Sequence, residues 1–99
     1  MINKVVIIGQ LTDDRLFLDE QEKLTIVEGF VLTEDSVSHK IRYVKITLYN
    51  DMAKKFYAKQ NTYKECICTY VGELAYNEKR QCNVLRINDL PVPLQSVEE

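Results

Sequence analysis

One segment of this chain has the period of a helix and interrupts an otherwise strand-like sequence. Within residues 50–60, Met52 and Phe56 are four positions apart, which gives a short helix one apolar face. Asn50 or Asp51 is suited to serve as the N-cap. The rest of the chain is rich in β-branched and aromatic residues, which favour strands. The sequence therefore predicts strands on both sides of a single helix.

Five segments have the composition of strands, and they are residues 4–11, 24–33, 41–49, 65–74 and 82–90. Three strands, one short helix and two strands follow one another in the order of an OB-fold, a five-stranded Greek-key barrel. A length of 99 residues suits one domain. We therefore predict a mainly all-β protein with one OB-fold domain at residues 1–94 and a short C-terminal tail at residues 95–99.

The three glycines all lie inside predicted strands and not in turns. Glycine weakens a strand interior unless the strand must bulge or bend. A small barrel requires such bends. We therefore expect bends at Gly9, Gly29 and Gly72.

Motifs for metal binding or catalysis are not evident. Cys66, Cys68 and Cys82 form neither a CxxC pair nor an even-numbered set, and His39 is the only histidine. We expect the cysteines to act as small hydrophobic residues, with no metal and no cofactor. There is no glycine-rich phosphate loop and no recognisable catalytic motif, so we expect no enzymatic activity.

Apolar runs in this sequence are short. The longest covers residues 5–8, far below the length of a membrane span, and no signal-peptide pattern precedes it. These features predict a cytoplasmic protein with no membrane partner.

Charge is unevenly distributed along the chain, although the net charge is only −2. Residues 1–40 contain four Lys/Arg and eight Asp/Glu, whereas residues 41–90 contain nine Lys/Arg and five Asp/Glu. A basic stretch in an acidic chain suggests a face that binds an anion. Chance clustering of solvated charges would explain the charge pattern equally well.

The third predicted strand carries the clearest functional pattern. Aliphatic residues at 44, 46 and 48 alternate with Tyr43, Lys45, Thr47 and Tyr49, so the two sets lie on opposite faces. Two rings and a cation on one face would form a stacking platform for nucleic-acid bases, worth about 1–3 kcal/mol per base. The alternative is that tyrosine is simply a good strand residue at half-exposed sites.

Other basic and aromatic residues extend this candidate DNA-binding set. Phosphate neutralisation by cations supplies most nonspecific affinity for nucleic acid. The additional candidates are Arg42, Lys54, Lys55, Tyr76, Lys79, Arg80 and Arg86.

The residues Asn-Lys-Val-Val-Ile-Ile-Gly-Gln-Leu-Thr-Asp-Asp at 3–14 resemble the opening of bacterial single-stranded DNA-binding proteins. Weaker similarities follow in the same order at residues 30–33, 44–49 and 71–74. The resemblance implies an OB-fold that binds single-stranded DNA in replication, recombination and repair. It also implies that Tyr43 and Tyr49 stack on bases.

The sequence departs from that family in two respects. It has no tryptophan, and it lacks a long tail with an acidic tip. A tail-less domain of this size also resembles the primosomal replication protein N type, whose dimers bind single strands and partner proteins. The alternative function is therefore an OB-fold protein-interaction module with replication proteins as partners and weak or no DNA binding.

The first strand is apolar on both faces, which is unusual for an exposed edge. In the family that the chain resembles, first strands pair between subunits. We therefore expect a homo-oligomer, a dimer or a tetramer, whose interface includes Asn3, Lys4, Val5, Val6, Ile7 and Ile8.

Overall fold

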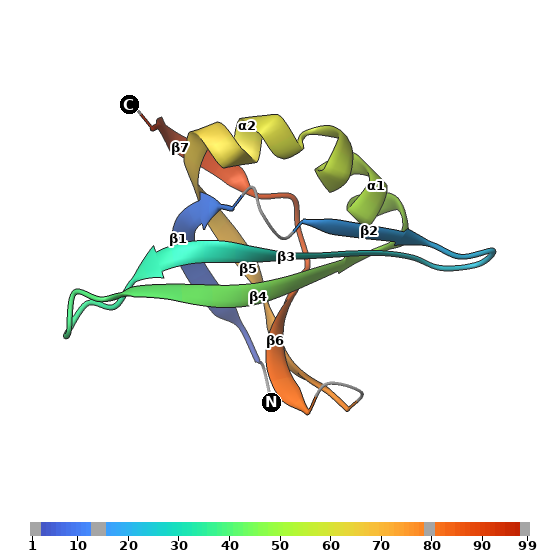
Figure 1. Cartoon of the computed structure of the whole chain (residues 1–99), viewed down its shortest axis with the longest axis horizontal. Helices are drawn as coiled ribbons and strands as arrows, with labels where there is room; N and C mark the ends of the chain where they lie inside the picture. Colours follow the sequence, from blue (N-terminus) through green and yellow to red (C-terminus); the bar gives the residue numbers. More distant parts are fainter. Residues whose placement is uncertain (1–2, 13–15, 79–80, 98–99) are drawn as a thin grey trace.

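The computed structural model describes residues 3–12, 16–78 and 81–97, and these residues form seven strands and two short helices (Figure 1). In chain order the elements are β1 (Val5–Leu11), β2 (Phe17–Glu20), β3 (Thr25–Glu34), β4 (Ile41–Tyr49), α1 (Asn50–Ala58), α2 (Gln60–Glu65), β5 (Cys66–Asn77), β6 (Cys82–Ile87) and β7 (Val92–Ser96).

Five of the strands close into a barrel in the order β1-β3-β4-β6-β5, because β5 also pairs with β1. All pairs are antiparallel except β4 with β6. The helices α1 and α2 lie together at one end of the barrel, whereas the β5–β6 hairpin and the N-terminus lie at the other (Figure 1). A five-stranded barrel with helix between its third and fourth strands is an OB-fold, so the predicted fold class is confirmed.

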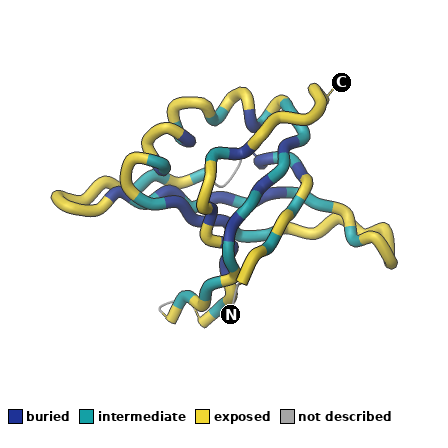
Figure 2. Tube along the Cα trace, turned by 180° about the vertical axis from the view of Figure 1, so that it is seen from behind, coloured by how far each residue is buried: buried dark blue, intermediate teal, exposed yellow. Residues whose placement is uncertain are grey.

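The core fills the barrel beneath the helices. Along β3 the buried residues alternate with half-buried ones, because successive strand side chains point to opposite faces. From α1, Phe56 is fully buried and stacks on Tyr63 of α2, with ring centroids 4.9 Å apart. Tyr70 of β5 is also fully buried. Figure 2 shows burial concentrated in the barrel and exposure at the hairpin tips.

Three elements were not predicted from the sequence. Strand β2 pairs with β3 and lies outside the five-strand barrel, and β7 pairs with β5 in the same way. The strand β7 includes Gln95 and Ser96, which the prediction assigned to a tail. The helical region continues beyond Gln60 as α2.

The predicted N-cap of the helix is wrong. Tyr49 occupies the cap position of α1, and it makes no side-chain capping hydrogen bond. Asn50 adopts a left-handed φ of 57°, a conformation that asparagine tolerates better than most residues. Its Oδ1 accepts a hydrogen bond of 3.3 Å from the backbone N–H of Thr25. The Asn50 side chain therefore ties the start of α1 to β3.

Two of the three glycines are required because strands approach closely at their positions. A Cβ atom at Gly9 would collide with the backbone carbonyl oxygen of Leu32, and one at Gly72 with that of Arg86. At Gly29 the nearest atom would be Cδ1 of the Leu16 side chain at 3.1 Å. Because the described glycines have no positive φ, close approach and not an unusual φ explains Gly9 and Gly72.

The three cysteines differ in how deeply they are buried. Cys68 is fully buried, and its thiol pKa is raised to about 11, mainly by this burial and to a smaller extent by the neighbouring Cys66. Cys66 and Cys82 are half-buried. Within residues 3–12, 16–78 and 81–97, no group of three His, Cys, Asp or Glu side chains could hold a metal ion. No helix of these described segments is long and apolar enough to cross a membrane.

We predict that Gly72→Ala destabilises the protein by about 1–3 kcal/mol, because the added methyl group forces two backbones apart. Gly29→Ala is the matched control in another strand. Its methyl group meets only the end of a flexible side chain, and alanine also restricts the unfolded chain, so we expect a change below about 1 kcal/mol. Urea unfolding of both variants measures the difference, and equal losses of stability would contradict the role assigned to Gly72.

Candidate nucleic-acid interface

The barrel presents an outer face formed mainly by β2, β3 and β4. Antiparallel partners on adjacent strands point to the same side of a sheet, so the strand register defines this face. One row of partners runs through Phe17, Glu28 and Thr47, and the next through Asp19, Ile26 and Tyr49. The members of the outer face are Phe17, Asp19, Ile26, Glu28, Phe30, Tyr43, Lys45, Thr47 and Tyr49, continued by Arg86 of β6 and Glu73 of β5.

Four aromatic rings lie on the outer face. Tyr43 and Phe17 are 62% and 56% exposed. Phe30 contacts Tyr43 edge to face, with centroids 6.5 Å apart and an interplanar angle of 77°. Tyr49 is half-buried, and the guanidinium of Arg86 lies 5.9 Å from its ring centroid. Tyr43 and Tyr49 are therefore on one face, as predicted, at the two ends of a strand segment about 20 Å long.

A groove lies beside Tyr49 on this face. It has a volume of about 210 Å³, and its lining comes from β2, β3, β4 and the end of β5. The lining residues are Phe17, Asp19, Gln21, Ile26, Glu28, Tyr49 and Asn77. Two rings and four polar side chains therefore share a cavity of a size suited to a small planar group.

The two cations of the outer face are paired with carboxylates. Lys45 Nζ lies 3.4 Å from Glu28 Oε2, and these side chains are only 12% and 17% exposed. Arg86 Nη1 donates a 3.0 Å hydrogen bond to Glu73 Oε1. Thr47, between these pairs, is buried. With Asp19 included, the outer face carries three carboxylates against two cations, so it is not a basic surface.

Three further basic candidates that the structure describes, Arg42, Lys54 and Lys55, lie away from the outer face. Arg42 has the opposite parity to Tyr43 on β4 and is exposed near the hairpin tip. There the backbone N–H groups of Ser38 and Val37 lower the pKa of Asp35, with a smaller contribution from the charge of Arg42. Lys54 and Lys55 are exposed on α1, at the end of the barrel. Lys79 and Arg80 lie outside the described residues.

Tyr76, the remaining aromatic candidate, is 58% exposed on β5, but its parity places it on the face opposite to that of Glu73. Among the eight DNA-binding candidates that the structure describes, it therefore brings together Tyr43, Lys45, Tyr49 and Arg86.

Sequence analysis missed two rings of the outer face. Phe30 alternates with the buried residues Gly29 and Val31, so the parity argument used for the third predicted strand would have found it. Phe17 belongs to a strand of only four residues, whose short apolar run gives a weak signal.

A strand edge beside the outer face is also open. Residues 5–9 of β1 pair on one side with β5, whereas the pairing of β1 with β3 involves Gln10 and Leu11. The Asn3 side chain extends the first pairing, because its Nδ2 donates to the carbonyl of Leu74 at 2.8 Å and its Oδ1 accepts from the Leu74 N–H. Val6 and Ile8 are 53% and 55% exposed on this strand.

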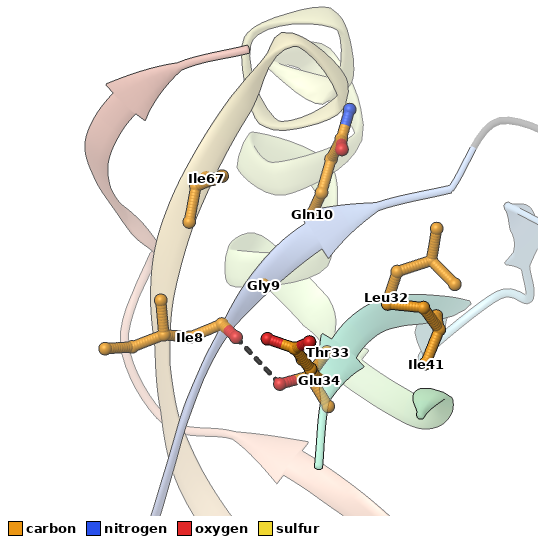
Figure 3. A pocket seen from close by; sticks show the side chains of 8 residues that line it. All are labelled: Ile8, Gly9, Gln10, Leu32, Thr33, Glu34, Ile41 and Ile67. Atoms are coloured by element: carbon orange, nitrogen blue, oxygen red, sulfur yellow. Dashed lines mark hydrogen bonds between the residues drawn. The ribbon is translucent and has the colours of Figure 1, made fainter. Parts of the chain in front are cut away.

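An apolar hollow of about 350 Å³ adjoins that edge (Figure 3). Ile8 and Ile67 lie on one side of it, and Leu32 and Ile41 lie across from them. At its floor the Thr33 hydroxyl donates a 2.9 Å hydrogen bond to the Ile8 carbonyl. Such a hollow beside an incompletely paired strand is typical of a surface that another chain covers.

Because the Lys45–Glu28 pair is partly buried, we expect that breaking it lowers the free energy of unfolding. Lys45→Met leaves the Glu28 carboxylate without its cation in a half-buried position, and we expect a loss of about 1–3 kcal/mol, less than for a fully buried pair. Glu28→Gln in the same background is expected to restore part of this loss. A double-mutant cycle of urea unfolding measures the coupling, and additive losses would contradict the interaction.

The fold and the outer face together define an OB-fold protein with an aromatic sheet surface. No protein-family model matches the sequence, and no curated protein matches it. Similarity to solved structures, in contrast, is extensive. The wild-type single-stranded DNA-binding protein from Thermus aquaticus has a TM-score of 0.72 at 15% identity, covering 99% of this chain and 43% of that one. This chain therefore spans less than half the length of the Thermus protein.

Two shorter structures match over nearly their whole length. The second single-stranded DNA-binding protein (SSBb) of Mycobacterium smegmatis has a TM-score of 0.71 at 17% identity, covering 98% of each chain. The dimeric N-terminal domain of PriB from Thermoanaerobacter tencongensis has a TM-score of 0.68 at 16% identity, covering 93% of this chain and 98% of that one. The fold implied by the sequence resemblance is thus the fold of the chain.

Proposed function

We propose that this protein binds single-stranded DNA without catalysis or sequence-specific recognition, in the context of replication, recombination and repair. The observation that carries the proposal is the set of four rings on the outer face, of which Phe17 and Tyr43 are exposed and Phe30 and Tyr49 are half-buried. Unpaired bases stack on such rings, whereas the bases of a duplex cannot reach them. Single-stranded DNA-binding proteins of the same fold support this function.

Stacking supplies most of the affinity in this proposal. Lys45 and Arg86 can meet phosphates only by sharing or leaving their carboxylate partners. A cation that is already paired with a carboxylate neutralises a phosphate less completely, so its contact with DNA releases fewer counterions. We therefore expect the dependence of affinity on salt to be shallower than for a basic groove of the same size.

The same charge balance favours a second function, a protein-interaction module of the primosome-accessory type with replication proteins as partners. A face with paired charges and exposed rings also suits a protein partner. A titration with single-stranded DNA distinguishes the two functions, since the interaction module binds the oligonucleotide weakly or not at all.

Substitution of the predicted stacking residues tests the main proposal. Tyr43→Ala and Tyr49→Ala are each expected to weaken single-strand binding by about 1–3 kcal/mol, because each removes one stacking surface. The slope of affinity against salt is expected to stay the same, since no charge is lost. Fluorescence anisotropy with a labelled oligonucleotide at several salt concentrations measures both quantities.

Tyr76→Ala provides the matched comparison for these variants. It removes a similarly exposed ring from the opposite face of β5, and we expect a smaller loss of affinity. Circular dichroism checks that each variant is folded. If a folded double variant of Tyr43 and Tyr49 binds single-stranded DNA as tightly as the parent, the outer face is not the binding surface.

The open edge of β1 supports an oligomer. We propose that a second copy of the chain covers residues 3–8, pairs with the free side of β1 and buries the exposed Val6 and Ile8. The dimeric PriB domain with the same fold agrees with this arrangement.

Light scattering at micromolar concentration is expected to give the mass of a dimer or a tetramer. Ile8→Glu places a charge in the covered surface and is expected to shift the mass toward the monomer. Val37→Glu makes the same chemical change at a valine that is 88% exposed on the β3–β4 hairpin tip, and we expect no effect. A monomeric parent protein would refute the oligomer.

A further inference from the structure

The polar side chains that line the groove beside Tyr49 are two carboxylates, Asp19 and Glu28, and two amides, Gln21 and Asn77. The walls of the groove also include the rings of Phe17 and Tyr49. No lysine or arginine is among its described lining residues. The groove thus combines stacking surfaces with hydrogen-bond acceptors.

The structure places Asp19 and Tyr49 in the same groove, two strands apart, with Ile26 between them. Asp19 pairs with Ile26 in the β2–β3 register, and Ile26 pairs with Tyr49, so the three side chains form one row across the face. Gln21 Nε2 donates a 3.1 Å hydrogen bond to Asp19 Oδ2. A carboxylate can accept about four hydrogen bonds, so Asp19 retains capacity for a ligand donor.

Glu28 lies in the adjacent row and is less accessible. Its carboxylate is paired with Lys45, and its side chain is only 17% exposed. The charge of Glu28 is offset by Lys45, so Asp19 is the principal hydrogen-bond acceptor that the groove offers. A ligand atom with partial negative charge is therefore disfavoured in the groove, whereas an N–H donor is favoured.

The bases of DNA differ in what they offer to such acceptors. Cytosine, adenine and guanine carry exocyclic amino groups, whereas thymine has none, and carboxylates are suitable partners for the cytosine N4 amine. Thymine presents a carbonyl oxygen at the equivalent position, and its only ring donor lies between two carbonyl oxygens. Stacking of a thymine here would leave an acceptor facing carboxylates, which costs affinity.

We propose that the groove formed by Phe17, Asp19 and Tyr49 binds bases that carry an exocyclic amino group, with cytosine preferred over thymine. This inference rests on the proposed single-strand binding and adds a base preference to it. The preference is graded, because the other rings of the outer face stack on any base.

The sharpest test compares oligonucleotides of thymidine with those of 5-methyldeoxycytidine. Both bases carry the same methyl group, so they differ only in the amino or carbonyl group at C4 and in the protonation of N3. In a fluorescence anisotropy titration at pH 8, we expect the methylcytidine oligomer to bind about tenfold more tightly.

Asp19→Asn tests whether this carboxylate causes the preference. The amide is nearly isosteric and can donate a hydrogen bond to the thymine carbonyl, so the tenfold ratio is expected to fall to about twofold or less. Glu20→Gln is the control, because it removes the same charge from the next residue of β2, which points to the opposite face. We expect Glu20→Gln to keep the ratio of the parent.

The possible outcomes separate this inference from the proposed function. Tight binding of both oligomers with equal affinity would refute the base preference and leave single-strand binding intact. A preference that survives in Asp19→Asn would refute the role of Asp19 and with it the proposal. Failure of the parent to bind any oligomer would overturn both the function and the preference.

Discussion

The close approach of backbones where the barrel closes is the constraint on which the rest of the structure depends. Strand β5 pairs with β1 on one side and with β6 on the other, and Gly72 is the residue at which both pairings meet. A side chain there would collide with the β6 backbone. Because β6 also pairs with β4, this contact fixes β4 relative to β1. It thereby fixes the outer face relative to the open strand edge.

The cations of the outer face are paired with carboxylates, so this face is not the basic, anion-binding face that the sequence suggested. Lysine and arginine residues are numerous between residues 41 and 90, but the strand register places Glu28 and Glu73 beside the two cations of the face. Neutralised cations attract a polyanion only weakly over distance. In the proposed function, stacking geometry therefore governs affinity, and the proposed base preference rests on a carboxylate of this face.

Features of the fold that follow from local patterns were predictable from the sequence, whereas contacts between separate strands were not. Period-two alternation is a local pattern, so it correctly placed Ile46 and Leu48, which are buried, on the face opposite to that of Tyr43 and Tyr49. The pairing of Lys45 with Glu28 depends on the register between β3 and β4, and no local pattern in the sequence specifies that register. The short strand β2 was missed for a related reason, since its stability comes from pairing with β3 and not from its own four residues.

The β3–β4 hairpin belongs to both proposed surfaces and so links them physically. Leu32 lines the apolar hollow beside β1, and its cross-strand partner Tyr43 is the most exposed ring of the outer face. Cross-strand partners share a side of the sheet, so a subunit that fills the hollow would also border the ring of Tyr43. The proposed assembly through β1 and the proposed stacking on Tyr43 therefore share one pair of strands, so the two surfaces are parts of one structural unit.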